Sequence, residues 1–275
     1  MKWKFAALVT GVTLVGWTTY SSITLAQNTA PIGLMQDPAM RVKVKDAKLG
    51  DIRVLATAAI VGPLKAVRAQ AEKAVGKPLV IEYGSARGNL REEILNGEEF
   101  EVAILLPDVN AELKAHQDIE PMEFEIARVP VAIGVRGGVA VDVSTSAALK
   151  STLLNAASVR YAPTGAAHDT VEKLLTSLAV GGLIKDSSSR PPNSAAELAP
   201  GQYEIELYPL SEMIHMSDVK NLGPVIDPFQ VPVKIEAAIG AHANDRQAAQ
   251  ALIAFLRSAA MKPSLEQNGM TPGSL

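Results

Sequence analysis

Residues 52–84 of the chain are IRVLATAAIVGPLKAVRAQAEKAVGKPLVIEYG. The segment 52–57 is mostly aliphatic and β-branched, which is typical of a buried strand. Residues 63–75 then repeat small and aliphatic side chains at helical spacing, and Gly76 marks the end of that helix. Residues 79–83 again have the composition of a strand. A strand, a helix and a second strand in this order indicate a parallel βαβ unit, and therefore an α/β fold.

Strand and helix patterns continue to alternate through the rest of the chain. We expect further strands at 101–106, 129–135, 159–162, 203–208 and 231–239, of which 203–208 alternates with period two and is predicted to be less buried. We expect helices at 90–95, at 109–115 with Asp108 as N-cap, after Ser144 as N-cap, at 168–180, and after Asp245 as N-cap. This order predicts parallel, doubly wound sheets with helices on their faces.

The same order of patterns predicts how the chain is divided. We expect an α/β fold of two lobes, each a doubly wound sheet flanked by helices, with 51–133 plus 233–275 in the first lobe and 134–232 in the second. Two crossover strands join the lobes, so a ligand cleft is expected between them at the carboxyl ends of the strands. Residues 27–50 are predicted to be an extended leader with little core content.

The N-terminus has the three-part pattern of a secretory signal peptide. Positive charge at Lys2 and Lys4 precedes the apolar residues 5–17, and Ala26 ends a small-x-small cleavage site. We predict that residues 1–26 are removed and that the mature protein is periplasmic, without stable membrane insertion. The alternative is a membrane anchor, but the apolar core is shorter than the ~20 residues that span a bilayer.

The composition argues against several functional classes. The chain of 275 residues has no cysteine, which excludes disulfide scaffolds, cysteine nucleophiles and lipidated cysteine anchors. With 26 Lys and Arg against 29 Asp and Glu, the net charge is −3, unlike the basic excess of nucleic-acid-binding proteins. Because His116, His215 and His242 lie in no metal-ligand spacing, we expect no metal and no cofactor. We also expect a monomer.

An ordered set of short segments resembles the molybdate-type periplasmic substrate-binding proteins of ABC importers. The resemblance implies the type II periplasmic-binding-protein fold, a small anionic ligand and the membrane subunits of an importer as partners. In sequence, these segments are more similar to a divergent branch of the family, which also contains a periplasmic aconitate isomerase. The segments are IRVLATAAI (52–60), YGSARGNLR (83–91), EVAIL (101–105), ARVPVAIGVR (127–136), DVSTSAALK (142–150) and QALIAFLR (250–257).

The resemblance also implies an anion site built from strand-to-helix turns. Helix N-termini supply backbone N–H donors with a favourable dipole, and small residues let those donors approach the ligand. The family usually has a serine in the first turn; here that turn is AAI (58–60), and the nearest hydroxyl belongs to Thr57. The implied ligand-binding residues are Thr57, Ala58, Ala59, Ser85, Arg87, Gly165, Ala166 and Tyr208.

Arg87 departs from the family pattern, because a molybdate-type site uses neutral donors. A guanidinium matches a planar carboxylate in bidentate fashion, so an organic carboxylate is as good a candidate ligand as molybdate. Structural alternatives remain open for these residues. Arg87 can be a solvated loop charge, Ser85 a helix cap, and Thr57 and Tyr208 packing residues.

Two functions of different classes follow from these observations. The first is a binding protein that captures a small anion, an oxyanion such as molybdate or an organic carboxylate, for an ABC importer. The second is an isomerase that moves a proton on a tricarboxylate, similar to aconitate isomerase, and it requires a general base. The candidates for that base are His168, Tyr208, Glu212 and Ser211, and none of them lies in a catalytic motif. We expect binding rather than catalysis.

Overall fold

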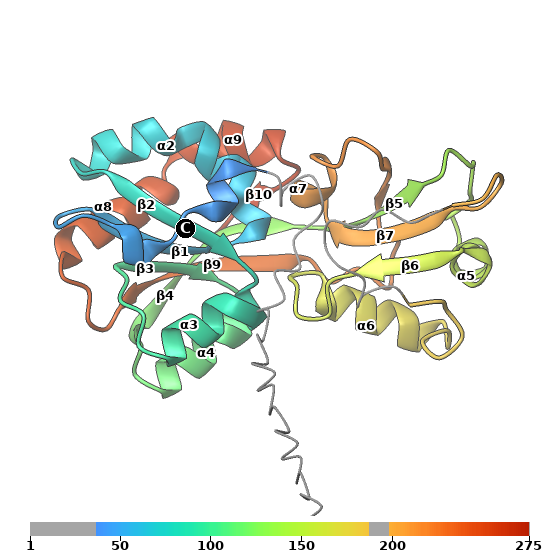
Figure 1. Ribbon diagram of the computed structural model, residues 1–275, viewed down its shortest axis with the longest axis horizontal. Coiled ribbons are helices and arrows are strands. Elements are labelled where there is room, and N and C mark those ends of the chain that lie inside the picture. The colour runs from blue at the N-terminus through green and yellow to red at the C-terminus, as the bar shows by residue number, and fades with distance from the viewer. Residues whose placement is uncertain (1–36, 187–197, 275) are drawn as a thin grey trace, which may run out of the picture.

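The computed structural model describes residues 37–186 and 198–274 (Figure 1). The predicted signal peptide and part of the predicted leader lie outside these residues. The helices are η1 (Pro38–Arg41), η2 (Val44–Asp46), η3 (Ala58–Ile60), α2 (Val61–Val75), η4 (Ala86–Leu90), α3 (Arg91–Leu95), α4 (Pro107–Ala115), α5 (Ser146–Asn155), α6 (His168–Ser177), α7 (Leu210–Met213), α8 (Arg246–Leu256), η5 (Ala259–Met261) and α9 (Lys262–Gln267). The strands are β1 (Ile52–Thr57), β2 (Leu79–Gly84), β3 (Val102–Leu105), β4 (Ile119–Val129), β5 (Val131–Arg136), β6 (Ser158–Tyr161), β7 (Glu204–Pro209), β8 (Lys220–Pro224), β9 (Val233–Gly240) and β10 (Thr271–Pro272).

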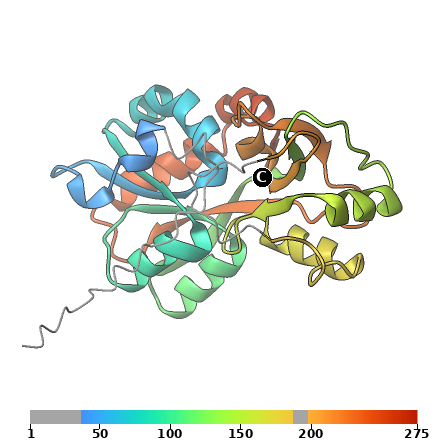
Figure 2. The ribbon, with the colours of Figure 1, turned by 45° about the vertical axis from the view of Figure 1, so that its right-hand side comes forward.

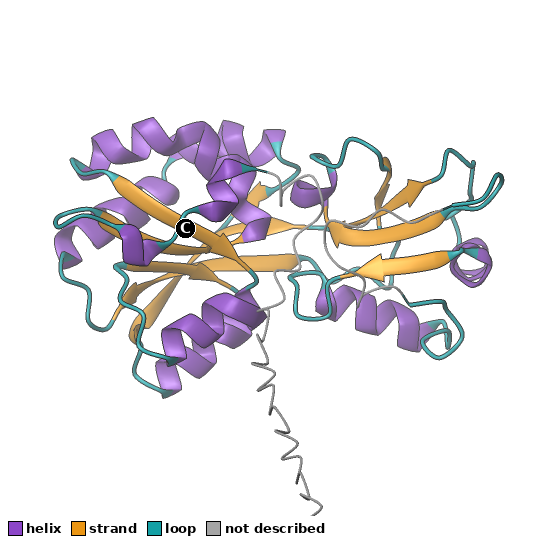
Figure 3. Cartoon of the chain, in the orientation of Figure 1, coloured by secondary structure: helices purple, strands orange, loops and turns teal. Residues whose placement is uncertain are grey.

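The larger sheet has the strand order β10-β4-β9-β3-β1-β2. Its strands β2, β1 and β3 are parallel neighbours, and β9 and β4 run antiparallel to their neighbours. Helices α2, α8 and α9 pack together over one face, and α3 and α4 pack together over the other (Figures 1 and 3). The sheet is therefore mixed, and the fully parallel arrangement that we predicted is wrong for β4, β9 and β10.

The smaller sheet has the strand order β6-β7-β5-β8. Strands β6 and β7 are parallel, so Tyr161 pairs with Leu207 near their carboxyl ends, whereas β5 runs antiparallel to β7 and β8. Helix α6 lies along this sheet, and the two sheets form separate bodies that meet at the centre of the molecule (Figures 1 and 2). The α/β class and the two-lobed arrangement are confirmed.

The chain passes between the sheets at two places. Strand β4 ends in the larger sheet at Val129 and β5 starts in the smaller sheet at Val131, with Pro130 between them. The single strand predicted at 129–135 is therefore two strands in two sheets, since proline lacks the N–H that a continuous ladder needs. The chain returns between β8 and β9. The lobe boundaries at 133 and 233 stay predictions; the sheets change at Pro130.

Three local predictions are wrong for identifiable reasons. Strand β7, predicted to be less buried, is buried at every residue, because its glutamates point toward basic side chains rather than water. Asp108 lies in the first turn of α4, whose N-cap is Leu106, and the Asp108 carboxylate binds Arg87 instead. The cap of α5 is Thr145, which accepts a hydrogen bond from the N–H of Ala148 at 3.1 Å, rather than Ser144.

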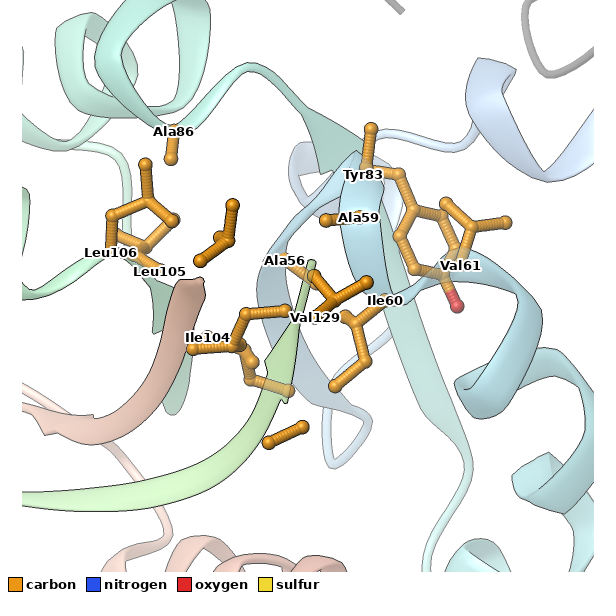
Figure 4. Packing of buried hydrophobic residues seen from close by; sticks show 14 of the residues in the cluster. Ala56, Ala59, Ile60, Val61, Tyr83, Ala86, Ile104, Leu105, Leu106 and Val129 are labelled. Carbon is orange, nitrogen blue, oxygen red and sulfur yellow. The ribbon is translucent and has the colours of Figure 1, made fainter. Parts of the chain in front are cut away.

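The hydrophobic core reaches the carboxyl ends of the central strands. Ala56 and Ile104 are fully buried in β1 and β3, and Ala59 and Ile60 belong to the same core (Figure 4). Buried apolar side chains of this kind fix the strand ends in place. The turns that follow β1 and β2 are therefore held on a rigid base.

Candidate functional site

Four strands of the described structure end around one small cavity. They are the parallel neighbours β1 and β2 of the larger sheet and the parallel neighbours β6 and β7 of the smaller sheet. Each strand is followed by a turn that leads into a helix, which is the usual position of a ligand site in α/β folds. The lining residues are Thr57, Ala58, Gly84, Ser85, Ala86, Ala162, Gly165, Ala166, Ala167, Tyr208, Pro209 and Glu212.

The end of β1 contributes a buried hydroxyl and a helix N-terminus. The Thr57 residue is 2% exposed, and its side chain lines the cavity. The chain then enters η3 and α2 without a break, so the first N–H groups of this helical segment have no partner inside the helix. Ala58 lines the cavity, and the absence of a long side chain leaves its N–H accessible to a ligand.

The end of β2 is a tight turn held by Asn89. The Oδ1 atom of Asn89 accepts a hydrogen bond from the N–H of Ser85 at 2.9 Å. A Cβ atom added to Gly84 would lie 2.6 Å from the side-chain amide of Asn89, so only glycine fits there. This local geometry presents the Ser85 hydroxyl to the other lobe, where it donates to the carbonyl of Thr164 at 3.0 Å.

The end of β6 leads through a turn of small residues into α6. The N–H of Gly165 donates to the carbonyl of Ala162 at 2.9 Å, and a Cβ atom on Gly165 would lie 2.5 Å from the Cβ of Ala162. Ala166 and Ala167 complete the cavity wall on this side. His168 begins α6 but does not line the cavity, and its buried Nδ1 atom has no hydrogen-bond partner among the described residues.

The end of β7 brings a tyrosine and a glutamate into the cavity. Tyr208 is 3% exposed, and burial raises the pKa of its hydroxyl, which therefore stays protonated and able to donate. Pro209 turns the chain into the short helix α7. From this helix the Ser211 hydroxyl donates to the carbonyl of Ala59 at 2.7 Å, which ties α7 to the first turn of the other lobe.

Glu212 is the acidic residue of the cavity wall. It is 5% exposed, and burial raises the pKa of its carboxyl to about 8. At pH 7 the neutral acid is therefore the main form, and a neutral carboxylic acid donates one hydrogen bond. Glu212 and Tyr208 are the ionisable side chains among the lining residues, so the described wall of the cavity carries no cationic side chain.

Arg87 lies outside this cavity, in a neighbouring hollow. Its Nε donates to Asp108 at 2.6 Å, its Nη1 to the carbonyl of Gly165 at 3.0 Å, and its Nη2 to Asp169 at 3.2 Å. The guanidinium is thus already paired with acceptors from both lobes. This arrangement does not support the expectation that the Arg87 guanidinium binds a carboxylate ligand.

The two lobes touch around the cavity and leave little room in it. Contacts cross between the lobes at Ser85, at Arg87 and at Ser211. The cavity volume is about 20 Å³ for the centres of water molecules, and one water needs about 10–15 Å³ on this measure. A compact ligand suits such a space better than an extended one.

Most of the predicted site residues meet at the cavity. Thr57, Ala58, Ser85, Gly165, Ala166, Tyr208 and Glu212 line it, whereas Ala59, Arg87 and His168 do not. Their contact with a ligand stays a prediction. Five further lining residues were not among the predicted site residues, although all adjoin predicted strand ends and could have been found by extending each turn in both directions: Gly84, Ala86, Ala162, Ala167 and Pro209.

The described residues provide neither a metal-binding cluster nor a membrane-spanning helix. Within 37–186 and 198–274, no group of three or more Asp, Glu, His or Cys residues is placed to hold a metal ion. Within the same residues, no helix has the length and apolarity that crossing a membrane requires.

A family model of bacterial extracellular solute-binding proteins matches residues 52–271. The chain belongs to this family. The matched residues include both sheets and all four turns of the cavity of this solute-binding protein. The search of curated proteins found no match to the chain.

Solved structures of periplasmic binding proteins share the fold of this solute-binding protein. The molybdate-binding protein of Azotobacter vinelandii is 16% identical with a TM-score of 0.61, covering 81% of this chain and 100% of its own. The tungstate-binding protein TupA of Desulfovibrio alaskensis G20 is 14% identical with a TM-score of 0.56, covering 82% and 99%. PEB3, known from Campylobacter jejuni and solved with L-phospholactate, is 12% identical with a TM-score of 0.58, covering 81% and 100%.

Proposed function

We propose that this solute-binding protein captures a compact oxyanion of the molybdate, tungstate or sulfate class in the central cavity. The observation that carries the proposal is the convergence of uncharged donors. Thr57 and Tyr208 supply hydroxyl donors, and the turns before α2 and α6 supply backbone N–H groups. Ser85 lines the same cavity, but its hydroxyl proton is already donated to the carbonyl of Thr164. Helix N-termini and oriented hydroxyls stabilise an anion without a cationic side chain. This fits a protein whose net charge is negative.

The proposed biological role is delivery of the anion to an ABC importer from the periplasm. Membership in the solute-binding family supports this role, and the predicted signal peptide at 1–26 agrees with it. Two solved proteins of the same fold are named for binding molybdate and tungstate. The isomerase alternative is less favoured, because the cavity is small and lacks the cationic groups that would hold a tricarboxylate.

Thermal unfolding with a panel of anions tests this function. The purified mature protein is heated with molybdate, tungstate, sulfate, citrate or the aconitates. An oxyanion at 100 times its dissociation constant stabilises the folded state by about 2.7 kcal/mol, which raises Tm by about 5–10 °C for a chain of this size. We expect this rise for at least one oxyanion and none for the carboxylates. A shift with carboxylates alone, or turnover of trans-aconitate, would refute the proposal.

A matched pair of variants places the binding in the cavity. Thr57→Val keeps the shape of the side chain and removes its hydroxyl, so we expect oxyanion affinity to fall about tenfold, as for the loss of one hydrogen bond to a charged group. Thr176→Val makes the same change at an exposed position of α6 and should leave the affinity unchanged. Equal affinities for Thr57→Val and wild type would show that the anion binds elsewhere.

A further inference from the structure

Glu212 differs from every other deeply buried glutamate of the described chain. Glu82 accepts from the N–H of Val44 at 2.9 Å, Glu101 pairs with Arg53 at 2.8 Å, and Glu206 pairs with Arg136 at 2.8 Å. The carboxylate of Glu204 accepts from Ser158. Only 5% of the surface of Glu212 is exposed. No described residue donates a hydrogen bond to its carboxyl or forms an ion pair with it.

Glu212 lines the cavity, so its unpaired carboxyl belongs to a residue of the site rather than of the hydrophobic core. A buried ionised carboxylate without a partner is costly, and it would repel an anion bound a few ångströms away. A neutral carboxylic acid has neither cost and adds one O–H donor. Burial raises the pKa of this carboxyl to about 8, in the direction that favours the neutral acid.

Among the described residues that line the cavity, none carries a positive charge that would neutralise an ionised Glu212. Among the cavity residues, Tyr208 of β7 is the other titratable group. The charges of Arg160 and Glu206 in turn affect the pKa of Tyr208. His215 lies in the turn that follows α7, and its Nε2 is 3.0 Å from Asn268 Oδ1. The larger lobe presents Thr57, Ala58, Gly84, Ser85 and Ala86, and the turn before α6 presents Ala162 and 165–167, none of which titrates.

We propose that Glu212 is a ligand-binding residue that holds the oxyanion as a neutral acid, donating its O–H to an oxyanion oxygen. This inference rests on the proposed function and deepens it. It makes anion binding dependent on a proton: below the pKa of Glu212 the proton is already present, and above it binding must take up a proton. Affinity is therefore constant at neutral pH and falls as pH rises through the pKa.

Calorimetric titration of the mature protein with tungstate tests the inference between pH 6.5 and 9.5. Tungstate keeps its double charge over this range, so the ligand adds no pH dependence. For a pKa of about 8, we expect the dissociation constant to be about tenfold higher at pH 9 than at pH 7. Repeating the titrations in buffers of different ionisation enthalpy should give almost no proton uptake at pH 6.5 and almost one proton per tungstate at pH 9.5.

Three variants test whether Glu212 causes the pH dependence of tungstate binding. Glu212→Gln keeps an N–H donor but carries no titrating proton, so its affinity, weaker than that of wild type at neutral pH, should not change between pH 7 and pH 9. Glu212→Met removes the donor and should weaken tungstate binding by about 10- to 100-fold at pH 7. Glu172→Gln, at an exposed site of α6, is the matched control and should behave like wild type. Circular dichroism checks that each variant is folded.

The outcomes separate this inference from the proposed function. If tungstate binds and Glu212→Gln keeps the pH dependence of wild type, or if Glu212→Met binds as tightly as wild type, Glu212 is not the proton-carrying donor and the inference is wrong. Tungstate binding that tightens with rising pH would also overturn it. If none of molybdate, tungstate and sulfate binds to wild type at any pH, the proposed function fails and the inference fails with it.

Discussion

Arg87 is the charged residue of the glycine-rich turn that follows β2. Its guanidinium has acceptors in both lobes, Asp108 on its own side and Gly165 and Asp169 across the cleft. Both aspartates are more than half exposed, so these ion pairs are largely solvated. Arg87 therefore joins the lobes at the rim of the cleft and is already paired where a ligand would need it free.

This pairing leads to a prediction for Arg87→Ala. Since solvated ion pairs contribute about 0–1 kcal/mol each, we expect tungstate affinity to fall by less than about fivefold. Arg91→Ala, which removes an arginine paired with Glu112 inside one lobe, is the matched control and should have no effect. Calorimetry of the two variants checks this, and a hundredfold loss for Arg87→Ala alone would mean that the guanidinium contacts the anion.

Some residues of the site could be predicted from the sequence and others could not. Thr57, Ser85 and Tyr208 were predicted because each follows or ends a strand pattern, and strand ends converge in α/β folds. The ion pairs of Arg87 could not be predicted, because its partners Asp108 and Asp169 are distant in the chain, and its contact with a ligand stays a prediction. Glu212 was considered only as a base, since its isolation from other charges is a property of packing.

At the scale of elements, β7 is the strand whose surroundings determine its chemistry. Its period-two pattern of glutamates predicted a half-exposed strand, but β5 on one side supplies Arg136, and β6 on the other supplies Arg160. Burial raises the pKa of Glu206 to about 7, and hydrogen bonding to Arg136 opposes that rise. A single strand pattern contains no information on the neighbouring strand, so this ion network could not be predicted.

Replacing Arg136, the cation shared by these glutamates, should destabilise the smaller sheet. Arg136→Met leaves Glu204 and Glu206 buried without their shared cation, so we expect a loss of about 3–5 kcal/mol in the free energy of unfolding at pH 8. The loss should shrink as pH falls below the pKa of Glu206, about 7, because a protonated carboxyl no longer needs a cation. Urea unfolding at pH 8 and pH 5 measures both values.

Arg246→Met is the control for that experiment. Arg246 is 65% exposed and pairs with Glu120 at the surface, so its replacement should change the free energy of unfolding very little. An Arg136→Met protein that is as stable as wild type at pH 8 would show that the buried carboxyls are neutral there without any help from the arginine.

For the whole molecule, the order of strand and helix patterns was enough to predict two α/β lobes with a site between them. It was not enough to predict the antiparallel pairs formed by β4, β9 and β10 in the larger sheet and by β5 in the smaller sheet, because strand direction depends on which edge each returning segment joins. It also gave no information on whether the lobes touch. The contacts of Ser85 and Ser211 across the cleft are what reduce the cavity to the size of a compact ligand.

The central claim is that a negatively charged, two-lobed solute-binding protein holds an oxyanion with uncharged donors alone. A crystal structure of the mature protein grown with tungstate tests it most directly, because tungsten gives a strong anomalous signal. We predict one dominant peak in the central cavity, within hydrogen-bond reach of Thr57, Ser85 and Tyr208. A peak in the hollow beside Arg87, with the central cavity left without tungsten, would contradict the claim.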